Sequence, residues 1–220
     1  MKNLNAQFAA APIPSRTPAG HTASPVVTPV PEFTRPASLG CFLPLVQKLA
    51  QARRAQEAGL IMLFCSLSRG EGVTYVVESL AWELSKYVGE RVLITTPTSL
   101  ENAAMSANPE IEPSPHPVLR MPESGVRRRT EQDLDWVGLQ ALRRQYGFVL
   151  VDGPALRASS QSISVAGQCD GTVLVVAAGE AKRSEIEYAQ AALESSPAKL
   201  LGVVLNKRTD AIPESLMRLL

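Results

Sequence analysis

Short apolar runs alternate along the chain with stretches whose apolar residues are spaced like one face of a helix. The runs "LIMLFCS", "FVLVD" and "LLGVVLN" are apolar at consecutive positions, which indicates strands that are covered on both faces. Such runs are typical of a parallel sheet. Strands are expected at residues 60–66, 91–95, 117–121, 148–152, 172–178 and 200–206.

The stretches between these runs carry apolar residues at helical spacing. In segment 75–88, for example, Val76, Leu80 and Leu84 share one helical face. Strands that alternate with such helices predict a doubly wound α/β domain, with a mostly parallel sheet and helices on both faces. Helices are expected at 42–58, 75–88, 131–146, 184–196 and 213–220, with a weaker helical tendency at 159–168 and a Pro-rich loop at 97–117.

Residues 1–40 differ from the rest because they are dense in Pro, Ala, Ser and Thr and show no sustained periodicity. Such a segment buries too little apolar surface to offset the entropy of ordering it. We therefore expect a disordered tail over residues 1–40 and a folded domain over residues 41–220. Within the tail, "PVVTPVPEF" is a candidate docking segment, and a plain disordered terminus is the alternative.

Charge and composition exclude several classes of function. Lys plus Arg total 22 and Asp plus Glu total 21, so no overall basic field would drive binding to nucleic acid or to a membrane. The three cysteines lack metal-type spacing, and the two histidines lie in Pro-rich loops, which argues against a histidine metal site or a catalytic triad. The apolar runs are too short to span a bilayer and the N-terminus is too polar for a secretory signal, so a cytoplasmic location is expected.

The segment "SLSRGEGVT", directly after the first strand, has the layout of a phosphate-binding loop. Gly70 and Gly72 suit a loop whose backbone amides cradle phosphates, and the Thr74 hydroxyl suits Mg²⁺. Val73 stands where such a loop carries its lysine. A bare turn before a helix is the alternative interpretation.

Three other strand ends carry candidate site residues, because ligands of such sheets bind at the carboxyl ends of the strands. Thr96 and Thr98 follow the second strand, where an ATPase of this layout would often have carboxylates. Asp152 ends the strand "FVLVD" as a Walker B acid would, although an Asp before Gly-Pro also suits a turn. Asn206 ends the last strand, where its amide could contact a base edge or simply form a turn.

The order of these segments resembles the bacterial tyrosine kinases of capsular and exopolysaccharide biosynthesis, in the MinD/ParA-like class of P-loop ATPases. The likeness runs from about residue 42 to 220 and rests on "GEGVT", "ERVLITTPTS", "YGFVLVDGPA" and "CDGTVLVVAAGEAKRSEI…LLGVVLNKR". It implies a P-loop NTPase-like fold, ATP and Mg²⁺ as cofactors, Asp152 as the catalytic Walker B acid, and Thr74 with Asp152 on the metal ion. The implied cofactor-binding residues are Gly70, Glu71, Gly72, Val73, Thr74, Tyr75 and Asn206.

The departures from the family pattern are as specific as the matches. The family's Walker A lysine is Val73 here, and the two aspartates of its acidic motif are Thr96 and Thr98. Loss of one charge-assisted hydrogen bond alone removes about 1.5 to 3 kcal/mol of phosphate binding. No tyrosine follows Tyr188, so the family's C-terminal tyrosine cluster has no counterpart.

These departures predict a degenerate family member, a pseudo-ATPase that acts as a regulatory or scaffold subunit of polysaccharide assembly or export. The alternative is an active ATPase or tyrosine autokinase that uses Arg69 or a neighbouring subunit's lysine. Dinucleotide binding by a Rossmann domain is weaker, because no acid follows the second strand to hold a ribose. The resemblance further implies a membrane chain-length regulator of the polysaccharide co-polymerase type as partner, a peripheral position at the inner membrane through it, and homo-oligomers.

Overall fold

In the computed structural model, one twisted sheet forms the centre of the domain. The structure describes residues 27–31, 42–105, 114–123, 137–179, 181–194, 197 and 199–207. Within them the strand order is β1-β4-β3-β5-β2-β6-β7, and every neighbouring pair is parallel except β1 with β4. The strands are β1 (Thr28–Pro29), β2 (Leu60–Ser66), β3 (Val92–Thr95), β4 (Val118–Arg120), β5 (Phe148–Asp152), β6 (Gly171–Ala177) and β7 (Leu200–Asn206).

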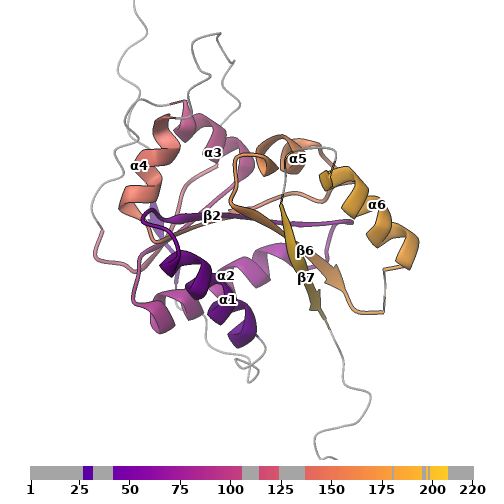
Figure 1. Cartoon of the computed structure of the whole chain (residues 1–220), viewed down its shortest axis with the longest axis horizontal. Coiled ribbons are helices and arrows are strands. Elements are labelled where there is room, and N and C mark those ends of the chain that lie inside the picture. The colour runs from indigo at the N-terminus through magenta and orange to yellow at the C-terminus, as the bar shows by residue number, and fades with distance from the viewer. Residues whose placement is uncertain are drawn as a thin grey trace, which may run out of the picture.

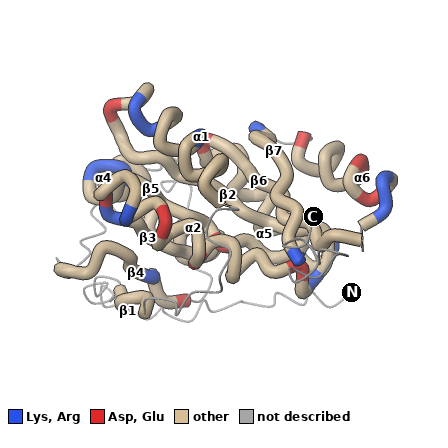
Figure 2. The backbone as a smooth tube through the Cα atoms, turned by 90° about the horizontal axis from the view of Figure 1, so that it is seen from below, with Lys and Arg blue, Asp and Glu red and all other residues tan. Residues whose placement is uncertain are grey.

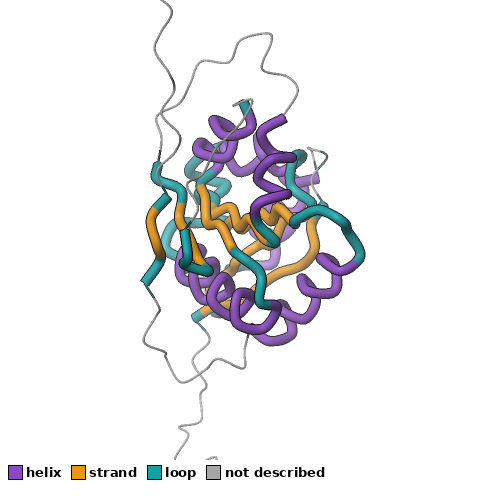
Figure 3. The backbone as a smooth tube through the Cα atoms, turned by 90° about the vertical axis from the view of Figure 1, so that its left-hand side faces the viewer, coloured by secondary structure: helices purple, strands orange, loops and turns teal. Residues whose placement is uncertain are grey.

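Helices cover both faces of this sheet (Figures 1 and 3). Helices α1 and α2 pack on one face, and α3, α4, α5 and α6 pack on the other. The predicted doubly wound α/β fold, with a mostly parallel sheet, is therefore confirmed. The helices are α1 (Leu43–Arg54), α2 (Val73–Val88), α3 (Pro97–Ala104), α4 (Val137–Gln145), α5 (Gln161–Ala166) and α6 (Arg183–Glu194).

The two layers explain why β2 is apolar throughout. Successive side chains of a strand point to opposite faces, so Ile61 and Leu63 enter the core under α3 to α6. Met62 and Phe64 enter the core under α1 and α2. All seven residues of β2 are buried, as expected of a central strand covered on both sides.

Helix α3 lies where the Pro-rich stretch was expected to be a loop, so that expectation is wrong for residues 97–104. The Thr96 hydroxyl accepts a hydrogen bond from the Ser99 amide at 3.3 Å and caps the helix. Pro97 occupies the first turn, where its missing N–H removes no helical hydrogen bond. A threonine followed by proline was thus a helix-start signal, not a loop signal.

Residues 27–31 also depart from expectation, because they lie on the sheet instead of in a disordered tail. Thr28 and Pro29 pair antiparallel with β4, and the Val30 amide donates to the Val118 carbonyl at 3.2 Å. Val30 is only 7% exposed, and the Trp82 indole donates to the Pro31 carbonyl at 3.1 Å. The buried valine and these hydrogen bonds offset the entropy of ordering so short a segment.

Other sequence-based expectations lie outside the described residues: the remainder of the tail, the first part of the helix at 131–146, and the helix at 213–220. No helix of the described part of the chain is long and apolar enough to cross a membrane. Figure 2 shows Lys and Arg on several elements, including α1, α4 and α6, with Asp and Glu interspersed. The described surface thus carries both signs of charge, but α1 and α4 contain basic residues and no acidic ones, whereas α6 contains both.

Candidate functional site

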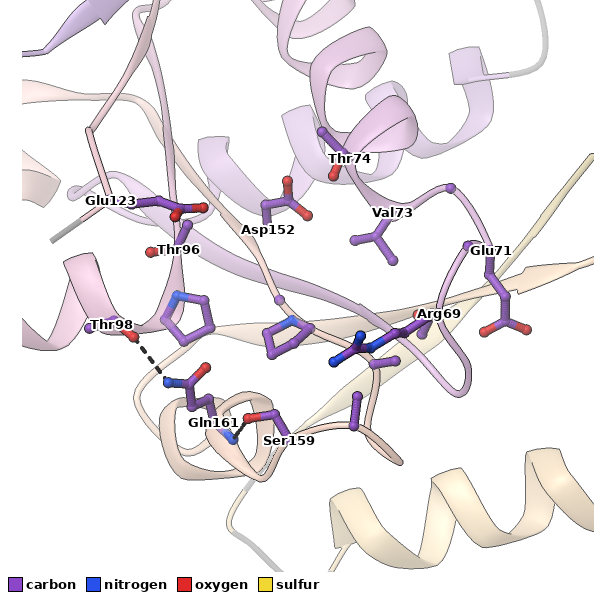
Figure 4. A pocket seen from close by; sticks show the side chains of 18 of the residues that line it. Arg69, Glu71, Val73, Thr74, Thr96, Thr98, Glu123, Asp152, Ser159 and Gln161 are labelled. Atoms are coloured by element: carbon purple, nitrogen blue, oxygen red, sulfur yellow. Dashed lines mark hydrogen bonds between the residues drawn. The ribbon is translucent and has the colours of Figure 1, made fainter. Parts of the chain in front are cut away.

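The carboxyl ends of β2, β3, β4 and β5 open into one cleft of about 710 Å³ (Figure 4). Its walls are the loop after β2 with the start of α2, the start of α3, the end of β4, and the loop between β5 and α5. This is the edge at which ligands bind in open α/β sheets. Of the predicted site residues, Gly70, Glu71, Gly72, Val73, Thr74 and Asp152 line this cleft.

The loop after β2 is held in shape from within by Glu71. The residue is 4% exposed, and one of its carboxylate oxygens accepts hydrogen bonds from the amides of Leu67 and Ser68, each at 2.8 Å. The other oxygen accepts from the Ala177 amide on β6 at 3.5 Å. The Glu71 carboxylate therefore ties the loop to the neighbouring strand β6. The residue also lines the cleft.

Asn206, at the end of β7, braces the same loop. Its side-chain amide donates to the Glu71 carbonyl at 2.9 Å. Gly72 has a φ of 89°, and a Cβ at this position would lie 2.2 Å from the Asn206 amide nitrogen. Glycine is therefore required at position 72 both by backbone conformation and by space. The Asn206 amide, predicted as a contact to a base, makes a hydrogen bond within the protein and does not line the cleft.

Helix α2 starts directly behind this loop and directs its first turn at the cleft. Gly72 caps it without any side-chain hydrogen bond, and no acidic residue lies in the first turn. The first amides of a helix have no partner within it, and together with the helix dipole they favour an anion. Val73 is 9% exposed and packs into the core on the α2 side, while Tyr75 packs partly against that core and does not line the cleft.

A cluster of charged groups lies opposite the loop. Asp152 ends β5, and its carboxylate shares a hydrogen bond with the Thr74 side chain. Arg120 ends β4 and places its guanidinium 3.9 Å from Asp152 and 2.5 Å from Glu78 of α2. Burial raises the pKa of Asp152, and the Thr74 hydrogen bond and the Arg120 charge oppose that rise.

Sequence reasoning missed Arg120, although a signal was present. The segment "PVLRM" was expected to be a strand, and its arginine follows two apolar residues at the carboxyl end. A charged residue at the carboxyl end of a parallel strand faces the ligand edge of the sheet. The sequence does not reveal which strands are adjacent in the sheet. In the structure β4 lies beside β3, and the Arg120 side chain reaches Asp152 on β5 and Glu78 on α2.

The wall formed by α3 carries hydroxyl groups that are already engaged. Thr96 caps α3, and the Thr98 hydroxyl accepts from the Gln161 side-chain amide at 3.2 Å, as drawn in Figure 4. These two threonines therefore tie α3 to itself and to α5. Arg69 lines the opposite part of the cleft, on the loop itself.

This donor set fits the phosphate groups of a nucleotide but not its divalent cation. The loop amides, the two glycines and the start of α2 suit phosphate oxygens. Arg120, however, directs a permanent positive charge at Asp152, the one carboxylate bonded to Thr74. Within the described residues, no group of three or more His, Cys, Asp or Glu side chains could hold a metal ion.

No family model matches the chain, but it is similar to known proteins in both sequence and fold. Tyrosine-protein kinase CpsD of Streptococcus agalactiae is 32% identical over 74 residues, covering 34% of this chain and 32% of the relative. CpsD of Streptococcus pneumoniae serotype 4 is 26% identical over 110 residues, covering 50% of this chain and 44% of the relative. The chain thus spans less than half the length of these curated relatives.

Solved kinase domains share the fold over most of the chain. The BceF tyrosine kinase domain aligns with a TM-score of 0.57 and 20% identity, covering 76% of each chain. The VpsO kinase domain gives 0.59 and 17%, covering 78% of this chain and 94% of the other. The kinase domain of Escherichia coli tyrosine kinase ETK gives 0.59 and 16%, covering 80% of each. The resemblance inferred from the sequence is therefore confirmed: the chain has homologues among bacterial proteins named tyrosine-protein kinase CpsD, and it shares the fold of bacterial tyrosine kinase domains.

Proposed function

We propose that this chain is a degenerate relative of the capsular tyrosine kinases, a pseudo-ATPase that acts as a regulatory or scaffold subunit of polysaccharide assembly or export. The observation that carries the proposal is the contrast within the cleft. Hydrogen bonds made by Glu71 and Asn206 hold the loop in shape. Val73, by contrast, packs into the core at the position where a lysine would bind phosphate.

Catalysis of phosphoryl transfer depends almost entirely on positioning and on charge stabilisation. The Val73 side chain offers neither charge nor hydrogen bond to a phosphate. Thr96 and Thr98 are hydroxyls that already serve α3 and α5, and a threonine hydroxyl acts neither as a general base nor as an anionic metal ligand. The described cleft thus retains a means of binding phosphate and lacks the means of transferring it.

The proposed role follows from what the fold retains. A rigid loop that binds a phosphate group without turnover can hold a domain in one conformation, and a partner can then recognise that conformation. Because the sequence relatives are capsular kinases, the proposed partner is a membrane chain-length regulator of the polysaccharide co-polymerase type. Such a partner would bring the protein to the inner membrane, and homo-oligomers would provide the scaffold.

The second candidate function is an active ATPase or tyrosine autokinase with a non-standard phosphate loop. One observation favours it: Arg69 lines the cleft and carries a permanent positive charge beside Gly70. In that case Arg69, or a lysine from a neighbouring subunit, would replace the missing lysine. ATP would be the cofactor, with Thr74 and Asp152 as the candidate ligands for Mg²⁺.

Turnover separates the two functions. The full chain is incubated with Mg²⁺ and γ-labelled ATP, and both released phosphate and phosphotyrosine are measured beside a D152N variant. We expect no turnover above the D152N background. Phosphate release or autophosphorylation that exceeds this background, and that an R69Q variant abolishes, would contradict the pseudo-ATPase proposal and support the alternative.

A further inference from the structure

Arg120 occupies a central position in the cleft. It bridges Glu78 on α2 and Asp152 on β5, with side-chain nitrogens at 2.5 Å and 3.9 Å from the two carboxylates. The three side chains are 29%, 19% and 13% exposed, respectively. Water therefore screens these interactions less than it screens an exposed ion pair.

The backbone of Arg120 is held from both sides, which fixes where its side chain can reach. On one side, Thr28 of β1 is its partner in the antiparallel pair, and the Thr28 hydroxyl donates to the Arg120 carbonyl at 3.5 Å. On the other side, β4 runs parallel to β3, and the next residue, Met121, donates its amide to the Ile94 carbonyl at 2.8 Å. The segment predicted to be a loose tail thus helps to hold this arginine at the cleft.

The position of the guanidinium matters for any metal ion. In a nucleotide site of this layout, the divalent cation lies beside the hydroxyl that follows the loop and the acid that ends the neighbouring strand. Here that pair is Thr74 and Asp152. Arg120 supplies the positive charge beside this pair, and the carboxylates of Glu78 and Glu123 add negative charge near Asp152. An arginine cannot lose its proton in a protein, so it repels a second cation at every accessible pH.

The same guanidinium suits a phosphate. Its planar donors match phosphate oxygens, and it faces the cleft together with the loop and the start of α2. We propose that Arg120 is the resident cation of this cleft and replaces the divalent metal, so that the cleft binds the phosphate groups of a nucleoside diphosphate or triphosphate without Mg²⁺. This inference deepens the proposed function and rests on its premise that the cleft binds phosphate.

The test is a calorimetric titration of the full chain with ADP, with ATP and with pyrophosphate, each in EDTA and in Mg²⁺. We expect Kd values for ADP and ATP that agree within about twofold between the two conditions. Pyrophosphate distinguishes a general phosphate site, which would bind it equally, from one that also uses the nucleoside. Absence of binding by all three ligands in EDTA, or binding at least tenfold tighter with Mg²⁺, would overturn the inference.

Variants test the role of Arg120 itself. Arg120→Gln should weaken binding in EDTA by at least tenfold and make the remaining binding depend on Mg²⁺. Arg53→Gln is the matched control, because Arg53 pairs with Glu90 at 2.9 Å with similar exposure and does not line the cleft. Unchanged binding by folded Arg120→Gln protein would refute the inference.

A second variant covers the case in which Arg120→Gln does not fold. Glu78→Gln removes the carboxylate that competes for the guanidinium, and it should tighten ADP binding in EDTA several-fold; no change or a loss would count against the inference. Turnover measured in the same samples separates the two proposals. Mg²⁺-enhanced binding without turnover contradicts only the role of Arg120, whereas turnover together with metal-independent binding contradicts only the pseudo-ATPase.

Discussion

The two sides of the cleft differ in how far they match the pattern of the tyrosine kinases that the sequence resembles. The loop after β2 keeps its glycines, its buried Glu71 and its brace from Asn206. The positions that would supply charge are different, because Val73 and Thr96 carry none and Arg120 brings a cation to Asp152. Under the proposed function, the frame of a nucleotide site and its charged groups are therefore separable in this fold.

A physical reason for the difference lies in what each side contributes to folding. Glu71 is buried and satisfies backbone amides, so its loss leaves donors unpaired in the interior. Val73 instead adds an apolar side chain to the core at the start of α2, where a lysine would add none. The Glu71 frame therefore contributes to the stability of the fold, whereas a lysine at position 73 would not.

The largest expected effect comes from breaking the frame. Glu71→Ala removes the acceptor of the Leu67 and Ser68 amides and should lower the free energy of unfolding by about 3 kcal/mol. Urea denaturation of the variant beside Glu57→Ala, an exposed residue, measures this. Equal stability of the two variants would show that the carboxylate does not hold the loop.

Much of the fold could be predicted from the sequence, because each central strand is a continuous apolar run. Helix α3 was missed because the Pro-rich composition was given more weight than the Thr96 cap and Pro97 at the first turn. Strand β1 was missed because its two residues show no period and become ordered only through contacts distant in sequence, such as that of Pro31 with Trp82. The spacing of apolar residues predicts a helix or strand well only where that helix or strand is long.

The candidate site divides in the same way. The loop from residue 67 to 72 and Asp152 were predicted, because each motif is contiguous and ends a strand. The inward direction of the Glu71 carboxylate and the place of Arg120 were not, because both depend on which strands are neighbours. The order of the strands in the sheet decides which side chains are in contact, and the sequence alone does not reveal this order.

The second prediction concerns the segment that holds β4 and hence Arg120. Deletion of residues 1–31 should cost about 2 kcal/mol of unfolding free energy, since it removes buried Val30 and the Trp82 hydrogen bond. Deletion of residues 1–26 is the control and should have little effect. Chemical denaturation of both chains decides the point, and equal stability would mean that the docked segment adds nothing.

A smaller effect is expected from the brace of the loop. Asn206→Ala removes one side-chain hydrogen bond to the Glu71 carbonyl and should cost about 1 kcal/mol. Thermal unfolding beside Asn206→Asp, which keeps the size but not the donor, measures it. If Asn206→Asp were as stable as the native chain, the donor would not matter and the brace would be ruled out.

The smallest effect concerns the charged side of the cleft. Burial raises the pKa of Asp152 above its usual value, so the folded state binds a proton more readily than the unfolded state. Stability should therefore fall as the pH rises from the usual pKa of a carboxyl to the raised one. Asp152→Asn should remove this pH dependence and be slightly more stable than the native chain at pH 7. Urea denaturation at several pH values measures both effects. A variant that is less stable than the native chain at pH 7 would contradict this prediction.

The central claim, that the frame is intact and only its charge is missing, is tested most directly by restoring the charge. The measurement is a calorimetric titration of the full chain with Mg·ATP, with native protein, Val73→Lys and the uncharged control Val73→Met. We predict that Val73→Lys binds at least tenfold tighter than both others, the gain of about one charge-assisted hydrogen bond. Equal affinity of the three folded proteins would contradict the claim, because it would mean that a charge at position 73 adds nothing to phosphate binding.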